Sequence, residues 1–234
     1  IGFDTTSGET FGIFAGTAIN DTSSVTAAAS TWDSMWGLGT ATLDKAVARR
    51  LVSPEVPVAR AVLVENGVVE SDLSSLVYPV IVKPNDEGSS KGICHQSIVM
   101  DSVAAVWRAR WLRENYHCPV LVEEFLAGTE VTIGIAGNGA DTRILGIMEI
   151  APAQAEPAWI YSLEVKRDWQ RQVRYHIPPR LAATTLAAME SYAFAAYRLL
   201  GCRDLARLDF RLDASGQPHF LECNPLPGLN PESG

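Results

Sequence analysis

The sequence predicts an α+β fold, because helices and strands alternate irregularly instead of in the regular order of a parallel array. Three segments with helical periodicity, residues 42–51, 102–115 and 179–200, are separated by short apolar runs typical of strands. A hairpin pattern at residues 205–222 follows the last helix. No internal repeat occurs, so a repeat architecture is not expected.

Composition is that of an ordinary globular protein and argues against several function classes. Of the 234 residues, 47% are hydrophobic and 20% are charged, which is too apolar for a disordered chain. The 19 basic and 27 acidic residues give a net charge of −8, so we expect no nucleic-acid partner. No run of 18 uncharged apolar residues occurs, so no membrane span is expected. Four cysteines without a CxxC pair indicate a reducing, cytoplasmic compartment and no structural zinc site.

The first 41 residues differ in composition from the rest of the chain. Residues 1–38 contain no Lys or Arg and are rich in Gly, Ala, Ser and Thr. The chain begins with Ile1, so we expect it to be processed or a fragment. We expect residues 1–41 to form an atypical N-terminal segment, either a buried segment or a poorly ordered tail, and the folded domain to begin at residue 42.

The elements follow from local patterns along the chain. Leu43, Val47 and Leu51 recur every four residues and predict a helix, which Pro54 ends. In the helix at 102–115, the apolar residues Val103, Val106 and Trp107 are expected on the buried face. Strands are predicted at residues 61–64, 78–82, 120–122, 131–135 and 144–150.

The two last elements carry the clearest signals. Two prolines, at 178 and 179, open the helix at 179–200, and Gly201 closes it. Residues 205–212 alternate between apolar and charged side chains, and the sequence Asp-Ala-Ser-Gly at 213–216 forms a turn. We therefore expect a hairpin with one apolar and one charged face.

The first candidate site combines Lys83 with the loop Glu-Gly-Ser-Ser-Lys-Gly at residues 87–92. Glycine allows backbone N–H groups to approach an anion, Ser89 and Ser90 add hydroxyl donors, and lysine supplies a charge for phosphate. The spacing differs from that of a P-loop. The loop alone also suits an ordinary hairpin turn.

A second candidate cluster, Glu123, Glu124 and Glu130, lies at the end of a predicted strand. Acidic residues there could accept hydrogen bonds from ribose hydroxyls, while neighbouring backbone contacts the edge of an adenine ring. The alternative is the solvated start of a helix, where acids interact favourably with the helix dipole.

The hairpin supplies the third cluster, Arg207, Asp209, Glu222 and Asn224. Because side chains alternate along a strand, the first two share one face, and the other two share one face of the returning strand. Two carboxylates and an amide oxygen that converge suit Mg²⁺. The alternative is a salt bridge from Arg207 or Arg211 to the acids.

A fourth cluster follows directly, with the turn Asn-Pro-Leu-Pro-Gly at residues 224–228 and then Asn230 and Ser233. Prolines and glycine make this segment a rigid turn. It could present backbone N–H groups to a substrate carboxylate, or it could only reverse the chain.

Taken together in chain order, these motifs resemble the ATP-grasp ligases, and most closely the C-terminal part of the D-alanine–D-alanine ligase family. The likeness begins near residue 42 and reaches the end of the chain. The matching stretches are YPVIVKP at 78–84 with EGSS at 87–90, LVEEFLAGTE at 121–130, ARLDF at 206–210 and LECNPLPG at 221–228.

The resemblance implies an ATP-grasp fold, in which two α/β subdomains clasp a nucleotide. It places the domain at residues 42–234, with a nucleotide-lid subdomain at about 78–135 and a metal and catalytic subdomain at about 136–234. It also implies that the N-terminal substrate domain of the family is largely missing from this chain.

The resemblance further implies roles for individual residues. Lys45 and Lys83 would hold the ATP phosphates, the segment 123–126 would meet adenine, and Glu130 would contact the ribose. The implied ATP contacts are Lys45, Lys83, Glu87, Gly88, Ser89, Glu123, Glu124, Phe125, Leu126 and Glu130. The implied ligands for Mg²⁺, or for Mn²⁺ in its place, are Asp209, Glu222 and Asn224. The implied catalytic residues are Arg207, Lys166 and Ser90, and the implied second-substrate contacts are Asn224, Gly228 and Ser233.

The resemblance implies an ATP-dependent ligation of two D-alanines through an acyl phosphate, in peptidoglycan precursor synthesis. It also allows a homodimer. Arg167 follows Lys166 where the family has a tyrosine that helps to select the nucleophile. The second substrate is therefore left open between D-alanine, another amino acid and a hydroxy acid. A truncated, non-catalytic fragment that binds ATP and Mg²⁺ is the further alternative.

Residues 11–25 resemble a segment of a sulfate exporter membrane family. The stretch is too short to imply a transport function, and its most apolar part, 11–19, is too short to span a membrane. A membrane-associated fragment is therefore the least favoured hypothesis.

Overall fold

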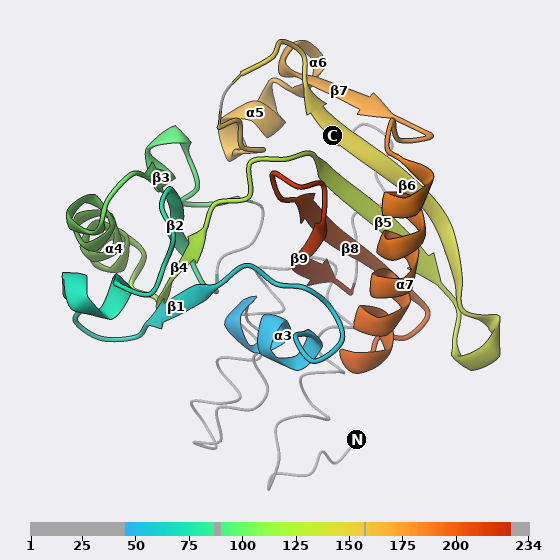
Figure 1. Ribbon diagram of the computed structural model, residues 1–234, viewed down its shortest axis with the longest axis horizontal. Helices are drawn as coiled ribbons and strands as arrows, with labels where there is room; N and C mark the ends of the chain where they lie inside the picture. Colours follow the sequence, from blue (N-terminus) through green and yellow to red (C-terminus); the bar gives the residue numbers. More distant parts are fainter. Residues whose placement is uncertain (1–44, 87–89, 157, 226–234) are drawn as a thin grey trace, which may run out of the picture.

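The computed structural model describes residues 45–86, 90–156 and 158–225, which form two lobes (Figure 1). We call residues 61–124 the small lobe. The large lobe comprises residues 45–52 and 130–225. Two crossings, residues 53–60 and 125–129, join the lobes, so the small lobe is one continuous insertion between two parts of the large lobe.

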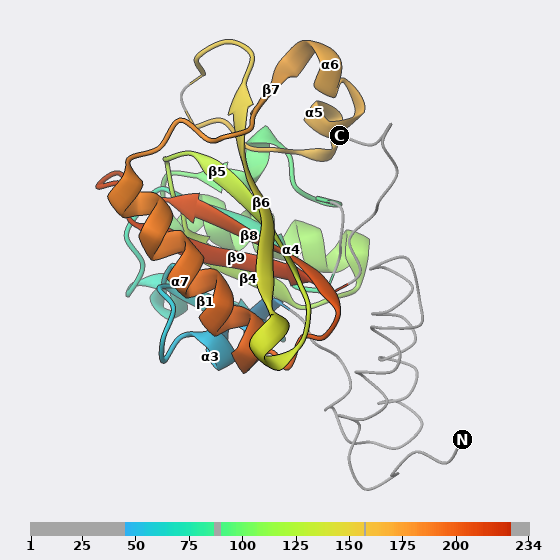
Figure 2. The same cartoon turned by 90° about the vertical axis from the view of Figure 1, so that its right-hand side faces the viewer.

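The small lobe is a four-stranded antiparallel sheet with one helix packed against it. The strand order is β1-β4-β2-β3. Its apolar core lies between this sheet and α4, as the views of Figure 1 and Figure 2 agree. The elements are β1 (Ala61–Val64), β2 (Val80–Pro84), β3 (Ile98–Val99), α4 (Ser102–Tyr116) and β4 (Val120–Glu124), with short 3-10 helices at Glu70–Leu73 and His95–Ser97.

Helix α4 has the predicted position but buries a different face. Asp101 caps its start, since the carboxylate accepts a hydrogen bond from Ala104 N at 2.8 Å. The expected apolar residues Val103 and Trp107 are 60% and 71% exposed, so that part of the prediction was wrong. The third expected residue, Val106, is buried in the small-lobe core as predicted. The rest of the apolar face toward the sheet is formed by two small residues, which allow a close approach, and one leucine: Ala105, Ala109 and Leu112.

The large lobe is a five-stranded antiparallel sheet in the order β7-β6-β5-β8-β9. Helix α7 covers one of its faces, and α3 lies against β9 and α7 at the lower end in Figure 1 (Figures 1 and 2). The elements are α3 (Lys45–Val52), β5 (Glu130–Ala136), a 3-10 helix at Gly139–Asp141, β6 (Arg143–Pro152), α5 (Leu163–Arg167), α6 (Trp169–Gln172), β7 (Val173–His176), α7 (Ala183–Leu199), β8 (Leu205–Leu212) and β9 (Pro218–Asn224).

Helix α7 begins four residues later than the sequence predicts. The Arg180 backbone N–H donates to Glu149 Oε2 at 2.8 Å, and the Arg180 guanidinium donates to both oxygens of the same carboxylate. These bonds hold the chain against β6 before the helix starts. Its other end is as predicted, because Gly201 has a φ of +64° and ends the helix in the left-handed conformation.

The predicted β8–β9 hairpin is confirmed, with a register shift between Asp209 and Phe210 that the sequence did not predict. The even-numbered residues of β8 are buried in the core, and the charged residues share the other face. The register places Arg207 opposite Asn224 and Asp209 opposite Glu222. The four candidate residues of the hairpin therefore lie side by side on one face of the large sheet.

The sheets divide the chain at other points than the expected subdomain boundaries. β1 lies before residue 78 yet belongs to the small sheet, and β5 begins at Glu130, before the expected boundary at 136, yet belongs to the large sheet. The second crossing is fastened to β8, because Gly128 N donates to Leu212 O at 2.9 Å. A Cβ at Gly128 would lie 2.6 Å from that carbonyl oxygen, so the close approach requires glycine.

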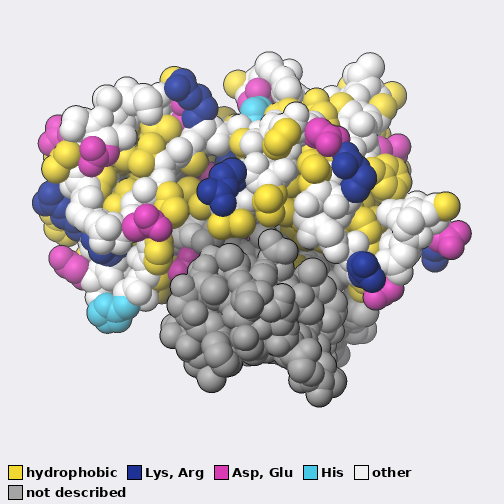
Figure 3. All heavy atoms as spheres, turned by 90° about the horizontal axis from the view of Figure 1, so that it is seen from below, with side chains coloured by type: hydrophobic (Ala, Val, Ile, Leu, Met, Phe, Trp, Pro, Cys, Tyr) yellow, Lys and Arg dark blue, Asp and Glu magenta, His cyan; other side chains and the backbone are white. Residues whose placement is uncertain are grey.

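No helix within residues 45–86, 90–156 and 158–225 has the length and apolar character to cross a bilayer. On the face seen from below, basic and acidic side chains are interspersed among hydrophobic ones (Figure 3). That face therefore carries no single-sign charge patch over the described residues.

Candidate active site

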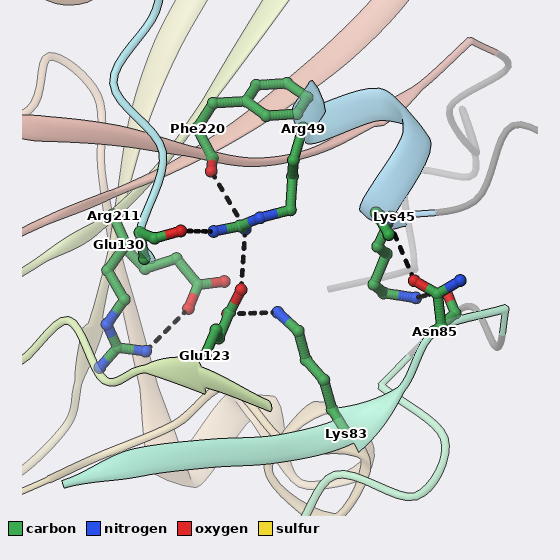
Figure 4. Close-up of polar contacts among 10 residues, drawn as sticks. Lys45, Arg49, Lys83, Asn85, Glu123, Glu130, Arg211 and Phe220 are labelled. Carbon is green, nitrogen blue, oxygen red and sulfur yellow. Dashed lines mark hydrogen bonds and ion pairs between the residues drawn. The ribbon is translucent and has the colours of Figure 1, made fainter. Parts of the chain in front are cut away.

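The small-lobe side of the candidate site is built around the buried carboxylate of Glu123, which is 3% exposed (Figure 4). Glu123 lies on β4 in the sheet that also contains Lys83 on β2. Lys83 Nζ is 2.5 Å from Glu123 Oε1, and Arg49 Nη1 is 2.9 Å from Glu123 Oε2. Arg49 comes from α3, so one carboxylate receives a cation from each lobe.

Burial and neighbouring charges shift the pKa values of Glu123 and Lys83 in this cluster. Burial raises the pKa of Glu123, but the charges of Arg49 and Lys83 outweigh burial, and the pKa of Glu123 is lowered overall. Burial lowers the pKa of Lys83, and the Glu123 carboxylate opposes that shift. Glu123 is therefore held ionised, with Arg49 as its permanent counter-charge.

Lys45 joins the same region from the first turn of α3. Its Nζ donates to the Asn85 carbonyl at 3.3 Å, and Ala46 N donates to Asn85 Oδ1 at 3.0 Å. Asn85 directly follows β2, so these bonds bring Lys45 to the end of the strand that carries Lys83 (Figure 4). The two predicted phosphate lysines therefore lie in one region.

The segment after Glu123 is a strand end followed by an extended crossing. The alternative of a helix start was wrong, because the next element after β4 is strand β5. Glu124 Oε1 accepts from Val77 N at 2.9 Å, and Phe125 N donates to Pro79 O at 2.9 Å. Among the described residues, no hydrogen bond engages the backbone of Leu126, which leaves its N–H and carbonyl available to a ligand.

The large-lobe side of the site is built around Asp209, which is 8% exposed. Arg207 grips it with two parallel bonds, Nε to Oδ1 and Nη2 to Oδ2, each 2.9 Å. Thr132 Oγ1 donates to Oδ1 at 2.6 Å, and Asn224 Nδ2 donates to Oδ2 at 3.1 Å. The alternative salt bridge from Arg207 is thus present in this structure, together with the convergence of Asp209, Glu222 and Asn224.

These residues fit a divalent cation by the chemistry of their donor atoms. Burial raises the pKa of Asp209, but the Arg207 charge and the bonds from Arg207 and Thr132 lower it overall, so the carboxylate is ionised. Glu222 lies directly across the strand pair, and Asn224 keeps its amide oxygen as an acceptor. Among the described residues, no three His, Cys, Asp or Glu side chains are grouped closely enough to hold a metal ion. Mg²⁺ commonly takes only one or two carboxylates together with substrate phosphates, which suits Asp209 and Glu222 with the Asn224 oxygen beside them.

Glu130 and Arg211 form a third pair, which Figure 4 shows beside the Glu123 cluster. They are opposite one another on β5 and β8, with Arg211 Nη1 3.4 Å from Glu130 Oε2. The pKa of Glu130 is raised overall, because burial raises it by more than the Arg211 charge lowers it. Charges on both sides influence this pair, since Glu123 acts on Arg211 and Asp209 acts on Glu130. The clusters are therefore electrostatically continuous.

Lys166 and Ser90 approach the site from opposite lobes. Lys166 Nζ lies 4.7 Å above the centre of the Tyr161 ring, and its charge acts on Glu130 and Asp209. Ser90 Oγ donates to the Tyr161 carbonyl at 3.0 Å. Tyr161 thus connects the loop after β2 with the segment that carries Lys166.

Five of the predicted site residues lie outside the described residues: Glu87, Gly88, Ser89, Gly228 and Ser233. A hollow of about 570 Å³ lies beside α4 and β3, and no predicted site residue lines it. Trp107 and Arg108 are among its lining residues. The candidate site therefore lies at the clusters around Glu123 and Asp209, which contain the ionisable side chains that could bind a nucleotide and a metal ion.

Three residues of the site have contacts that the sequence did not predict: Arg49, Thr132 and Arg211. Arg49 lies one helical turn after Lys45, and that spacing puts both on one side of α3. Thr132 faces Asp209 only because β5 pairs with β8 in a register that the sequence does not reveal. Arg211 was considered a partner of Asp209 or Glu222, but its partner is Glu130.

Comparison with known proteins decides the family. The family model described as the C-terminus of D-Ala–D-Ala ligase matches residues 52–233. The chain belongs to this family. A D-alanine–D-alanine ligase of Synechococcus sp. (strain JA-3-3Ab) is 36% identical over 161 residues, which cover 69% of this chain and 46% of that protein. One from Methylibium petroleiphilum (strain PM1) is 37% identical over 162 residues, covering 68% of this chain and 47% of that protein.

Solved structures confirm the α+β, ATP-grasp fold that the resemblance implied. The VanG D-Ala:D-Ser ligase of Enterococcus faecalis matches with a TM-score of 0.62 at 24% identity, covering 87% of this chain and 61% of that one. A Bacillus anthracis D-alanine–D-alanine ligase complexed with ATP matches with a TM-score of 0.64 at 21% identity, covering 88% and 65%. The chain spans about half the length of the curated relatives that it matches.

Proposed function

We propose that this chain supplies the ATP- and Mg²⁺-binding part of a ligase that joins two D-alanines through an acyl phosphate. Membership of the D-Ala–D-Ala ligase C-terminal family supports this proposal. The single observation that carries it is the pair Arg211 and Glu130, which is linked to both clusters: Glu123, the partner of Lys83, acts on Arg211, and Asp209 and Glu222 act on Glu130.

The binding roles follow from charge and position. Lys45 and Lys83 would neutralise the triphosphate, and the Leu126 backbone would meet the edge of the adenine ring. Glu130 would accept hydrogen bonds from the ribose hydroxyls. Asp209, Glu222 and Asn224 would hold Mg²⁺, which shields the charge on the phosphates when bound.

The catalytic roles concern the charge that develops during transfer. Phosphoryl transfer asks a protein mainly for positioning and for stabilisation of negative charge. Lys166, whose positive charge acts on Glu130 and Asp209, would face the terminal phosphate. Arg207 would stabilise the oxyanion when the amine attacks the acyl phosphate, a contact worth about 3–4 kcal/mol in other enzymes. Ser90, bonded to the Tyr161 carbonyl, would hold the loop that excludes water.

A second candidate keeps the reaction and changes the nucleophile. Arg167 follows Lys166 in α5, where the family has a tyrosine that helps to select the second substrate. Another amino acid or a hydroxy acid would then replace the second D-alanine. The chain could also bind ATP and Mg²⁺ without turnover, because it spans only about half of its curated relatives.

The experiment is a titration of ATP and Mg²⁺ with and without D-alanine, followed by measurement of ADP release. D-Alanine-dependent release of ADP supports the first proposal. Release that depends on another amino acid or on a hydroxy acid supports the second. Binding without release supports the non-catalytic fragment, and failure to bind ATP contradicts all three.

A further inference from the structure

Arg211 lies among the groups proposed to bind the nucleoside, although no motif assigns it to the nucleotide. It lies two residues after Asp209 on β8, so both side chains project from one face of the sheet. The register puts it directly opposite Glu130, the proposed ribose acid. Its side chain is 8% exposed, so it is part of the interior of this site.

Three contacts from three segments fix the guanidinium group. Nη1 lies 3.4 Å from Glu130 Oε2 (Figure 4). The guanidinium carbon lies 4.9 Å from the centre of the Phe125 ring, within range of a cation–π interaction. Nη2 donates to the Trp159 carbonyl. The group therefore holds together the ribose acid, the proposed adenine hinge and the loop before α5.

Stability alone gives a weak reason for an arginine at this position. Burial of a guanidinium is costly, and Arg211 Nε is buried without a hydrogen-bond partner among the described residues. A buried ion pair is often no more stabilising than apolar side chains of similar volume. What the arginine does provide is a fixed direction for the Glu130 carboxylate and for the Phe125 ring, because its planar fork binds in a defined orientation.

We propose that Arg211 is a positioning residue of the nucleotide site, which directs Glu130 at the ribose hydroxyls and so sets a preference for ribonucleoside triphosphates over their deoxy forms. This inference rests on the proposed function, since it requires the nucleotide to lie against Glu130. A carboxylate held in place gains charge-assisted hydrogen bonds from the ribose, and a carboxylate free to rotate gains fewer of them.

The test measures binding of ATP and of 2′,3′-dideoxy-ATP, each with Mg²⁺, to the full chain by calorimetry. The wild type is expected to prefer ATP by about 10–100-fold, the range for hydrogen bonds to a charged group. Arg211→Met is expected to reduce this ratio to about twofold through weaker ATP binding, with the dideoxy affinity nearly unchanged. Glu130→Gln is expected to do the same, and the double variant should add no further loss, because the residues act as one unit.

Arg198→Met is the matched control, since Arg198 forms an exposed ion pair with Glu55 and should leave the ratio unchanged. Arg211→Lys keeps the charge without the fork and should give an intermediate ratio. An unchanged ratio in Arg211→Met, or in Arg211→Lys if the methionine variant does not fold, overturns the inference alone. An unchanged ratio in Glu130→Gln does the same. A wild type that binds no ATP overturns the proposed function together with this inference.

Discussion

Glu123 and Asp209 are both buried acids at the same site, yet their surroundings differ in sign. Glu123 contacts two cations, Arg49 and Lys83, so two positive charges and one negative charge leave one positive charge. Asp209 contacts one cation, Arg207, and has Glu222 across the strand pair, so one positive charge and two negative charges leave one negative charge. A positive cluster suits phosphate, and a negative cluster suits a divalent cation.

The difference also separates structural from binding roles. Arg49 donates to the carbonyls of Phe220 and Ala59 as well as contacting Glu123, so it ties both lobes together. The Arg207 side chain is 37% exposed, and within the described residues its hydrogen bonds go to Asp209 on the same strand. We therefore expect loss of Arg49 to affect folding, and loss of Asp209 to affect ligand binding.

The largest expected effect is a loss of stability when Arg49, a partner of Glu123, is replaced. Arg49→Met leaves a buried carboxylate with one cation and two carbonyls without their donor, so the free energy of unfolding should fall by about 3 kcal/mol. Urea denaturation measures the change. Arg198→Met removes an exposed ion pair and should cost less than about 1 kcal/mol. Equal losses in the two variants would contradict a bridging role for Arg49.

The next largest effect concerns the Asp209 side. Asp209→Asn removes a charged oxygen ligand, so binding of ATP in the presence of Mg²⁺ should weaken by about 100-fold. Calorimetry with and without Mg²⁺ measures the loss. Asp213→Asn, in the turn that follows the same strand, is the matched control and should bind normally. Normal binding by Asp209→Asn would show that the metal ligands lie elsewhere.

A smaller effect distinguishes the lysines of the small lobe. Lys83→Met should weaken ATP binding by about tenfold, because one charge-assisted contact to phosphate is lost while Arg49 still neutralises Glu123. Lys91→Met, in the exposed part of the following loop, should weaken it less. Competition with a labelled nucleotide measures both affinities. Equal losses would remove the preference for Lys83.

The smallest expected effect is a pH dependence of stability at Asp213. Its carboxylate differs from those of Glu123 and Asp209, because it is held by hydrogen bonds and not by lysine or arginine. Bonds from Ser215, Gln217 and His219 lower the pKa of Asp213 to about 2. Because this pKa lies below its unfolded value near 4, the stabilisation is complete above about pH 4 and is lost as the pH falls toward 2. Asp213→Asn should abolish this pH dependence, at a cost of at most about 1 kcal/mol for a partly exposed group. Urea denaturation from pH 2 to pH 5 tests it, and an unchanged pH profile would count against it.

Local pattern was sufficient for the hairpin that carries half of the site. Alternation along residues 205–212 predicted which side chains share a face. The turn alone would pair Asp209 with residue 221, and a register shift between Asp209 and Phe210 places Glu222 opposite Asp209 instead. Helix α7 was also predicted at its C-terminal end, since Gly201 has the left-handed conformation that ends a helix. In these places the determining contacts lie close together in the sequence.

Long-range contacts account for what the sequence did not reveal. The start of α7 depends on Glu149, which binds Arg180 from another strand. The buried face of α4 depends on how closely Ala105 and Ala109 can approach the sheet, which overrides the larger apolar residues. The partnership of Arg49 with Glu123 joins α3 to the other lobe, and no local pattern contains it.

The two crossings between the lobes have a consequence for the architecture of the chain. Ala61 and Glu123 are paired across β1 and β4, and Glu124 N donates to Arg60 O at 2.9 Å, so the small lobe starts and finishes at one point. The small lobe is therefore attached to the large lobe through two adjacent chain segments. The small lobe could be exchanged for that of another family member by joining the chains within the two crossings, without interrupting any strand of the large sheet.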